Sequence, residues 1–316
     1  MTFNQLRYVV AISKYGSFSK ASEILKITQP ALTLQIKKLE EEIGLVLFDR
    51  SQKQISLTSE GEIIIAKATQ ILSLVDNLSD VAIELEDEIN GKLSIGIIPT
   101  IAPYITPLFI DELNKNYPKL KLNIIELITE DVVSRIKTGE LDLGIISTPV
   151  QAKGVVFTKL FYEKFYLFVS DQNELYSNDT VKIKEIDLND LWYLNEGNCF
   201  QNQVNALCKL SEKLIEKQNF RYQSNSIESL RYIVENRGGI TFIPELATLT
   251  ISSEKEGMVK DIEGILPVRE ISMITSKFVA KQKLIDAFLE ILLLNIPERM
   301  KTMQTNMILD TKIITD

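Results

Sequence analysis

The chain has 316 residues, of which 45% are hydrophobic and 25% charged, and its formal net charge is −8. This length allows two or three domains, and no apolar run approaches the ~20 residues that cross a membrane. Histidine is absent and only two cysteines are present, which excludes Ser-His-Asp and Cys-His catalysis, His-ligated metals and a secreted disulfide framework. No glycine motif for phosphate or dinucleotide binding is present. We therefore expect a cytoplasmic protein without membrane contact that is not an enzyme and holds no metal or cofactor.

Three short helices are predicted at the start of the chain. The apolar spacing predicts one helix over residues 4–15 and a second that begins at the N-cap Ser19. A third follows the N-cap Thr28, with Pro30 in its first turn, where the missing N–H of proline costs nothing. The second and third helices with their tight turn are typical of a helix-turn-helix, which enters the major groove of DNA. The inward-facing residues are Leu6, Val9, Val10 and Ile12; Ala21, Ile24 and Leu25; and Ala31, Leu32 or Leu34, Ile36 and Leu39.

The outward face of the third helix suits DNA. Glutamine can pair with adenine, threonine can contact a base edge, and lysine can neutralise phosphates. A hairpin wing is predicted over residues 48–57, with Arg50 and Lys53 near its tip. Residues 1–60 carry a net charge of +2 and the remainder −10, so basic residues are concentrated where DNA would bind. The alternative is a small helical bundle with an ordinary solvated face. The outward residues are Thr28, Gln29, Thr33, Gln35, Lys37 and Lys38.

The same stretch resembles the N-terminal domain of LysR-type transcriptional regulators. The similarity extends over LRYVVAISKYGSFSKASEILKITQPALTLQIKKLEEEIGLVLFDRS and is most specific from ASEILKITQP to VLFDR. The resemblance implies an all-α winged helix-turn-helix. It places DNA contacts at Thr28, Gln29, Pro30, Thr33, Gln35 and Arg50, and the basic residues Lys37 and Lys53 complete the expected DNA-binding set.

A single long helix is predicted from Thr58 to Ile89. An apolar stripe on ~30 residues is too long for an unsupported surface helix and suits a dimer seam. A helix packed on its own domain is the alternative. A dimer would present two recognition helices to the half-sites of a two-fold operator, and the resemblance implies a linker helix that dimerises, with further assembly to a homotetramer. The stripe comprises Ile64, Ile65, Ala68, Ile71, Leu72, Val75, Leu78, Val81, Ala82 and Leu85.

After Asn90 and Gly91 strands and helices alternate, which predicts an α/β domain with parallel strands. The phrases IGIIPTIAPYITP, TGELDLGII and GGITFIPE resemble the regulatory half of the same family. That implies two subdomains like a periplasmic binding protein, with crossovers near residues 163 and 267. Thr100 would follow the first strand at a helix N-terminus, which favours an anion or polar ligand. Strands are expected over 92–98, 120–127, 141–146, 165–170, 192–194, 240–243 and 271–275, and helices over 100–117, 130–138, 228–235 and 280–294.

The two cysteines, Cys199 and Cys208, are close in sequence. On a helix this spacing would be a rise of about 13.5 Å, whereas bridged cysteines have Cα atoms closer than ~7 Å. If the segment is helical when reduced, a disulfide requires that helix to break, which would make the bond a conformational switch. The alternative is two unrelated buried cysteines.

The segments GNCFQNQVNALC and NSIESLRYIVENRGGITFIPE resemble the hydrogen-peroxide-sensing members of the LysR family. The resemblance implies that peroxide oxidises Cys199 to a sulfenic acid and that Cys208 resolves it to a disulfide. It also implies that Thr100 and Thr129 help hold the peroxide and that Arg269 stabilises the thiolate.

The chain departs from that family pattern at Asn198, where His is common, and at Asn202, where Asp is frequent. Both asparagines are still expected at the effector site. Because Asn198 carries no positive charge, the thiolate must depend on Arg269, backbone amides or a helix end. This departure implies a lower sensitivity to peroxide or a different oxidant.

The expected organisation is a DNA-binding domain over 1–58, a dimerising linker helix over 59–90, a regulatory α/β domain over 91–300 and a tail over 301–316 with no assigned role. The leading interpretation is a regulator that binds double-stranded DNA, contacts RNA polymerase and alters transcription of oxidative-stress genes in response to hydrogen peroxide. One alternative is a regulator that responds to a small organic anion near Thr100, with inert cysteines. Another is a thiol peroxidase, although nothing in the sequence marks a turnover site.

Overall fold

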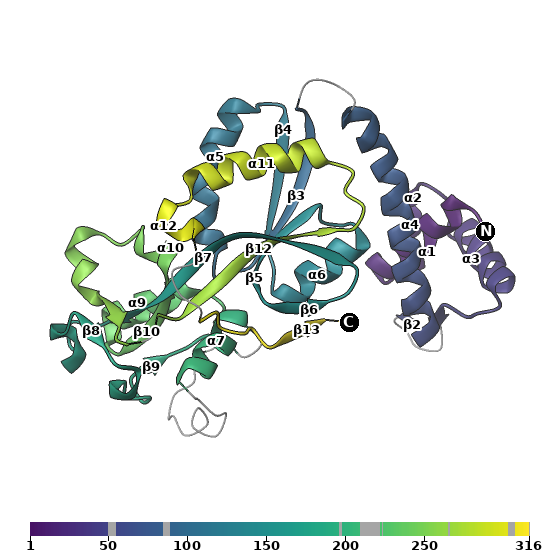
Figure 1. The fold of residues 1–316 in the computed structure, drawn as a ribbon. Helices are drawn as coiled ribbons and strands as arrows, with labels where there is room; N and C mark the ends of the chain where they lie inside the picture. Colours follow the sequence, from purple (N-terminus) through teal and green to yellow (C-terminus); the bar gives the residue numbers. More distant parts are fainter. Residues whose placement is uncertain are drawn as a thin grey trace. The chain divides into compact units, whose positions relative to one another are not determined.

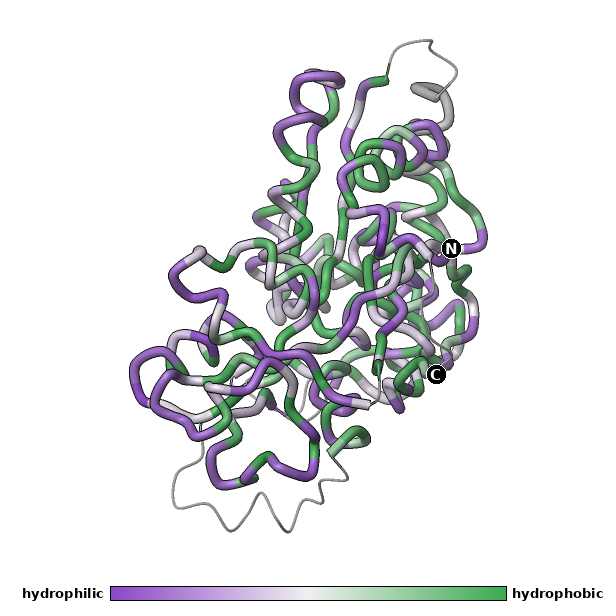
Figure 2. The backbone as a smooth tube through the Cα atoms, turned by 60° about the vertical axis from the view of Figure 1, so that its left-hand side comes forward, coloured by the Kyte–Doolittle hydropathy of each residue, from purple (hydrophilic) through white to green (hydrophobic). Residues whose placement is uncertain are grey.

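The computed structural model describes residues 1–49, 55–84, 89–195, 198–208, 222, 224–264, 266–302 and 307–315. The chain divides into two compact units (Figure 1). The first contains Met1–Glu86 and Lys137–Glu140, and the second contains Asp87–Ile136 and Leu141–Asp316. Figure 2 shows that hydrophobic and hydrophilic stretches alternate along both units and that outer loops of the second unit are largely hydrophilic.

The first unit is a small helical domain with a short antiparallel hairpin. Thr28 caps the third helix by accepting a hydrogen bond from the backbone N–H of Ala31, and Pro30 lies in its first turn, as the sequence predicts. The hairpin pairs Phe48 with Leu57. The elements are α1 (Phe3–Tyr15), α2 (Phe18–Leu25), α3 (Gln29–Ile43), β1 (Phe48–Asp49), β2 (Ser56–Leu57) and α4 (Ser59–Glu84).

Three details of this unit correct the sequence prediction. The N-cap of α2 is Ser17 and not Ser19, because the Ser17 hydroxyl accepts from the backbone N–H of Lys20. Ile24 is 48% exposed and does not join the apolar stripe. On α3 the core is filled by Leu32, Ile36 and Leu39, so Ala31 and Leu34, the other candidates, face solvent.

The N-terminal half of helix α4 packs into the core of the first unit. Ile65 and Ala68 are buried in the core that α1, α2 and α3 form, and Ile64 and Leu72 pack against that core. These positions were predicted as part of a dimer seam, and the alternative of packing within the domain is correct for them. Ile71, Leu74 and Leu78 are exposed. The side chains of Val81 and Ala82, and all of Leu85, lie outside the described residues.

The second unit is built on one mixed sheet of nine strands in the order β4-β3-β5-β12-β7-β10-β9, with β11 and β8 off this path. Strand β3 pairs in parallel with β4 and β5, as predicted. Strands β7 and β12 run antiparallel to each other and to their other neighbours, β10 and β5. The expectation of parallel strands is wrong for these two, because they carry the chain between subdomains instead of closing a strand-helix-strand unit.

The crossing strands join the two halves of the sheet. The register of β7 passes from β12, which it pairs over 155–164, to β10, which it pairs over 165–169. The strands of the main sheet path are β3 (Gly91–Ile97), β4 (Leu120–Glu126), β5 (Leu143–Thr148), β7 (Val155–Val169), β9 (Leu191–Trp192), β10 (Ile240–Pro244) and β12 (Val268–Ser276). Strands β8 (Thr180–Val181) and β11 (Val259–Ile262) lie at its side, and β6 (Val150–Ala152) pairs with β13 (Ile313–Thr315).

Helices cover this sheet and give the second unit a continuous buried core. The helices are α5 (Ala102–Asn116), α6 (Thr129–Thr138), α7 (Cys199–Cys208), α9 (Ile227–Arg237), α10 (Glu245–Thr248), α11 (Gln282–Asn295) and α12 (Glu298–Lys301), with short 3-10 turns at Glu174–Ser177, Ile183–Glu185 and Ser253–Met258. Within the described ranges, no helix is long and apolar enough to span a membrane.

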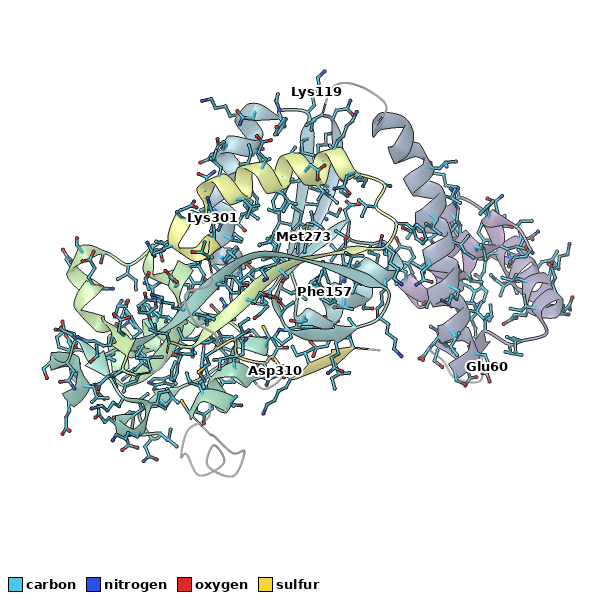
Figure 3. The ribbon with its side chains drawn as sticks, viewed as in Figure 1. Glu60, Lys119, Phe157, Met273, Lys301 and Asp310 are labelled. Carbon is cyan, nitrogen blue, oxygen red and sulfur yellow. The ribbon has the colours of Figure 1, made fainter. Side chains whose placement is uncertain are left out.

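The described part of the tail belongs to the second unit. Leu309, Thr311 and Ile313 are buried, and the backbone of Leu309 donates to the carbonyl of Val268 at 2.9 Å. Figure 3 labels Asp310 on this segment, next to β13. The sequence analysis assigned no role to this tail because its pattern is weak. The structure packs it beside β6 and β12.

Candidate functional site

The first candidate surface is the exposed N-terminal part of α3. Thr28, Gln29 and Pro30 are exposed. The Thr33 hydroxyl donates to the carbonyl of Gln29 at 2.9 Å, so Thr33 is partly engaged by its own helix. This face is the one the sequence predicts for DNA contact.

The remaining predicted DNA contacts fall into two groups. The Gln35 side chain is half-buried and accepts a 3.4 Å hydrogen bond from the Gln5 amide of α1. Lys37 is exposed and lies 3.7 Å from Glu41. Arg50 and Lys53 lie outside the described residues. The structure therefore presents Thr28, Gln29, Pro30 and Lys37 to solvent and turns Gln35 partly toward α1.

The second candidate site surrounds Cys199, the first residue of α7. Cys199 is 4% exposed, and the preceding Asn198 is also buried. The Asn198 side-chain oxygen accepts the backbone N–H of Phe200 at 3.0 Å, which is the bonding pattern of an N-cap. Asn198 therefore gives helix capping where the peroxide-sensing relatives were expected to carry a histidine. It leaves Cys199 at the positive end of the helix dipole, which favours a thiolate.

Arg269 of β12 supplies the cation of this site. It is fully buried, and its Nη1 donates to the Thr100 hydroxyl at 2.9 Å while Nη2 donates to the Thr100 carbonyl at 3.1 Å. Its guanidinium lies over the ring of Phe200, 5.0 Å from the centroid. Phe200 in turn stacks on Phe165 of β7 at 4.9 Å. Thr100 precedes α5 by two residues, and its hydroxyl serves Arg269 instead of capping that helix.

Glu163 of β7 is a buried partner that the sequence analysis missed. Its Oε2 lies 2.7 Å from both Nε and Nη2 of Arg269, and its Oε1 accepts the backbone N–H of Leu246 at 3.0 Å. Both side chains are inaccessible to solvent. Burial raises the pKa of Glu163, whereas the Arg269 charge and the Leu246 N–H oppose this rise. A polar residue inside a hydrophobic strand was the available signal, but only the folded chain supplies its partner.

Groups around Cys199 both raise and lower the pKa of its thiol. Burial raises the pKa of Cys199 above its ordinary value. The Arg269 charge, the Thr129 hydroxyl and the backbone N–H of Phe200 lower that pKa, and Glu130 raises it. Thr129 Oγ1 is buried beside this thiol and makes no other hydrogen bond within the described part of the chain. The predicted residues Thr100, Thr129, Asn198 and Arg269 thus meet around Cys199.

Cys208 ends the same helix in a different environment. Both cysteines are free thiols, and α7 is continuous from Cys199 to Cys208. Burial raises the pKa of Cys208 to about 12, and it is the one cause found among the described residues. With about 13.5 Å of helical rise between the two residues, a disulfide between them requires α7 to unwind.

Asn202 is not part of the cluster around Cys199. Its side-chain amide donates to the carbonyl of Thr311 in the tail at 2.9 Å. The neighbouring Gln203 donates to the carbonyl of Leu309 at 2.8 Å and to the Ser147 hydroxyl at 3.3 Å. Two successive side chains of α7 therefore hold the tail, a contact that the sequence analysis did not foresee.

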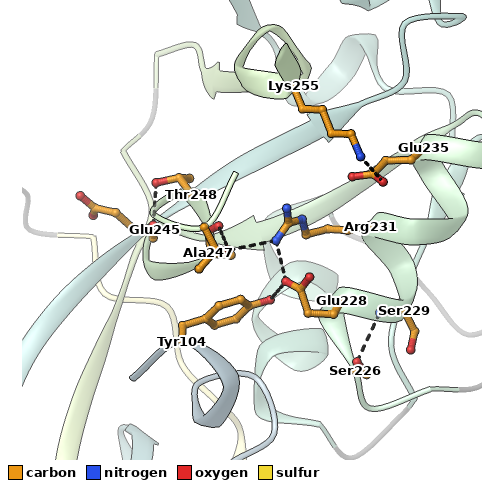
Figure 4. A network of polar contacts seen from close by, with 11 residues as sticks. Tyr104, Ser226, Glu228, Ser229, Arg231, Glu235, Glu245, Ala247, Thr248 and Lys255 are labelled. Carbon is orange, nitrogen blue, oxygen red and sulfur yellow. Dashed lines mark hydrogen bonds and ion pairs between the residues drawn. The ribbon is translucent and has the colours of Figure 1, made fainter. Parts of the chain in front are cut away.

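A second polar network connects α5 with α9 (Figure 4). The Tyr104 hydroxyl donates to Glu228 at 2.7 Å, and Arg231 Nη1 contacts the same carboxylate oxygen at 2.6 Å and the Thr250 hydroxyl at 3.3 Å. Burial and the charge of Glu228 raise the pKa of Tyr104, so the hydroxyl acts as a hydrogen-bond donor. This network ties α5 and α9 together within the second unit.

Comparison with known families identifies both units. Residues 3–62 match the bacterial regulatory helix-turn-helix protein, lysR family, and residues 86–295 match the LysR substrate binding domain. The chain belongs to the LysR family of bacterial transcription regulators. This membership confirms the predicted fold class and DNA-binding regulatory function, and it excludes the enzyme alternative.

Several relatives of this LysR-type regulator are named for peroxide. A hydrogen peroxide-inducible genes activator of Haemophilus influenzae is 31% identical over 81% of this chain and 84% of its own length. The regulator EstR of Acinetobacter baylyi is also 31% identical, over 92% of this chain and 96% of its own. A full-length OxyR variant of Pseudomonas aeruginosa has a TM-score of 0.75 at 28% identity and covers 93% of this chain and 98% of its own. The chain is thus OxyR-like within the LysR family.

Proposed function

We propose that this LysR-type regulator senses hydrogen peroxide through a thiol–disulfide switch between Cys199 and Cys208. The observation that carries the proposal is the cluster at the N-terminal end of α7, where a buried cysteine meets Arg269 and two threonines. The relatives named as hydrogen peroxide-inducible activators support the same assignment. Thr129 Oγ1, which is buried and faces the Cys199 thiol, gives a polar group for a small ligand.

The proposed chemistry proceeds in two steps. The Cys199 thiolate attacks one oxygen of H2O2, so that an S–O bond forms, the O–O bond breaks, and hydroxide leaves as water after it takes a proton. Cys208 then attacks the sulfur of the sulfenic acid, forming the S–S bond and releasing a second water. Two thiols and one peroxide give one disulfide and two waters, so no additional oxidant is needed.

The switch would change the structure around α7. The second step requires the two sulfur atoms to meet, and an intact α7 keeps them apart. Unwinding α7 would also remove Asn202 and Gln203 from the tail carbonyls that they bind. In this way a local oxidation would alter packing over a larger part of the second unit.

The output of the switch would be a change in DNA binding. We propose Thr28, Gln29, Pro30, Thr33, Gln35 and Lys37 as the DNA contacts of α3, with Arg50 and Lys53 beside them. The exposed apolar residues Ile71, Leu74 and Leu78 of α4 recur at spacings of three and four and support dimerisation through this helix. A homodimer, assembled further into a homotetramer, would bind a two-fold operator in the cytoplasm and act on RNA polymerase.

A small organic anion is a weaker candidate for the signal. Arg269 is the cation nearest Thr100 in the described part of this site, and Glu163 balances its charge at 2.7 Å. The cluster thus offers little net positive charge to an anion. The EstR relative has the same 31% identity as the peroxide-named activator, but its name does not mention peroxide. A signal other than peroxide is therefore one outcome of the test.

The deciding experiment follows thiol loss in the reduced protein under micromolar H2O2. We expect rapid loss at Cys199 and a Cys199–Cys208 linkage in peptide mass spectra. Cys199→Ser should lose the response and still bind DNA, whereas Cys208→Ser should accumulate a sulfenic acid. DNA protection by reduced and oxidised protein should differ. Thiol loss at the rate of an ordinary free cysteine, without linkage, would reject peroxide sensing and favour the anion.

A further inference from the structure

Arg269 is the largest fully buried side chain of the described chain, and nearly all its hydrogen-bond donors are occupied. A guanidinium carries five N–H groups in a rigid plane. Nε and one N–H of Nη2 are directed to Glu163 Oε2, the other N–H of Nη2 donates to the Thr100 carbonyl, and one N–H of Nη1 donates to the Thr100 hydroxyl. One hydrogen, on Nη1, remains for a further acceptor.

The rotation of the guanidinium is set by Glu163. Glu163 bonds the side of the fork opposite to Nη1, through a single oxygen that lies 2.7 Å from both Nε and Nη2. Its second oxygen is fixed by the backbone N–H of Leu246. The carboxylate is thus held between β7 and α10 and cannot turn without losing a buried hydrogen bond.

The charge of Glu163 also limits what Arg269 can do for Cys199. Among the described residues, Arg269 is the cationic group that acts on Cys199, and Glu130 is the anionic group that does so. The Thr129 hydroxyl and the Phe200 N–H are the neutral donors that face the thiol. Because Glu163 pairs with Arg269 at contact distance, it cancels much of the positive potential that would reach the sulfur.

We propose that Glu163 is a positioning residue for Cys199: it fixes the guanidinium of Arg269 over Phe200, the residue after Cys199, and its charge offsets that of Arg269. This inference rests on the proposed role of Cys199 as the reacting thiol. It assigns to β7 a part in setting the reactivity of a cysteine on α7.

The test is the charge-removing substitution Glu163→Gln. Its amide oxygen can still accept from Arg269, but its NH2 group replaces the oxygen that accepts from Leu246. Glu245→Gln is a matched control, because Glu245 is equally buried, binds Arg299 at 2.6 Å and accepts the Lys164 N–H at 3.1 Å. Glu245→Gln loses the same kind of bonds beside β7, but Glu245 makes no bond to Arg269 in the described structure.

The readout is the pKa of Cys199, measured by thiolate absorbance in the ultraviolet in a Cys208→Ser background. We expect Glu163→Gln to lower this pKa and Glu245→Gln to leave it unchanged. Each unit of lower pKa gives about tenfold more thiolate, and because nucleophilicity falls with pKa, the rate with peroxide at neutral pH should rise roughly threefold per unit. An unchanged Cys199 pKa in folded Glu163→Gln protein would overturn the proposal.

A double-variant cycle covers the case in which Glu163→Gln does not fold. Replacing both residues, as Glu163→Gln with Arg269→Gln, removes both buried charges. Compared with Arg269→Gln alone, the double variant should have a lower Cys199 pKa, because the negative charge of Glu163 acts at the sulfur whether or not Arg269 is present. An equal pKa would show that the Glu163 charge does not reach the sulfur and would contradict the proposal. Because thiolate absorbance needs no peroxide, a failure of peroxide sensing leaves this result readable.

Discussion

Cys199 and Cys208 lie at opposite ends of α7, and different groups surround them. Around Cys199 the effect of burial is opposed by Arg269, the Thr129 hydroxyl and the Phe200 N–H. Around Cys208, burial is the one cause found among the described residues, and it raises the thiol pKa to about 12. Burial by itself makes a thiol inert, so in the proposed switch Cys199 would react first, and Cys208 would react only after it leaves its buried position.

The largest expected effect comes from Arg269→Met, which removes the Arg269 charge from the Cys199 end of α7. The change leaves Glu163 as an unpaired buried carboxylate, and breaking a buried ion pair in this way costs about 3–5 kcal/mol in the free energy of unfolding. The pKa of Cys199 should rise further, and its peroxide reaction should slow. Urea unfolding and thiolate absorbance measure the two effects.

Lys182→Met is the control for that prediction. Lys182 pairs with Glu263 at 3.1 Å on the surface, so its loss should leave the unfolding midpoint nearly unchanged. If Arg269→Met protein were as stable as wild type, with an unaltered Cys199 pKa, the difference between the two ends of α7 would not depend on Arg269.

Removal of residues 307–316 is expected to have an intermediate effect. The deletion takes away the carbonyl acceptors that hold Asn202 and Gln203, and two net hydrogen bonds are worth on the order of 1–3 kcal/mol. The middle of α7 should therefore open more often, which brings Cys208 to Cys199 more readily. Amide hydrogen exchange over 199–208 and the rate of disulfide formation should both increase.

Ile314→Ala is the matched control for the deletion, because Ile314 lies on the same tail and is 69% exposed. It should leave exchange in α7 at the wild-type rate. Unchanged exchange after the deletion itself would show that the tail does not stabilise α7.

The smallest effect is expected from Asn198→His. Histidine is charged below its ordinary pKa of about 6.5, so it should lower the pKa of Cys199 and speed its reaction at pH 6, by a few-fold, and do little at pH 8. Asn198→Asp retains the capping oxygen but adds negative charge, so it should slow the reaction. Stopped-flow rates at the two pH values measure both. Equal effects of His and Asp would mean that only the cap at residue 198 matters.

Local sequence signals predicted the first unit well and the Cys199 site only in part. Thr28, Pro30 and the apolar spacing of α3 are short-range features, so they define that helix without tertiary knowledge. The partner of Arg269 could not be found in the same way, since Glu163 and Arg269 meet only because β7 and β12 pair antiparallel. Their pairing was missed because the alternation of strands and helices favoured a parallel sheet.

The tail and α4 illustrate the same limit. Leu309, Thr311 and Ile313 are buried in alternation with exposed Asp310, Lys312 and Ile314, a strand period that the polar composition of the tail obscured. On α4 one apolar stripe serves two purposes, since Ile65 and Ala68 fill a core whereas Ile71 and Leu78 remain exposed. A periodic pattern predicts that a face is apolar, but it does not say what covers that face.

Strand β7 also has a mechanical consequence. It is one continuous strand of 15 residues, paired with β12 on its first part and with β10 on its last. A bending motion between the two subdomains would have to deform this strand and break backbone hydrogen bonds that it makes with β12 or β10. Ligand-driven closure of the kind that flexible hinges allow would therefore be costly here, and the signal proposed for α7 would be better transmitted by a change in local order than by a rotation of whole subdomains.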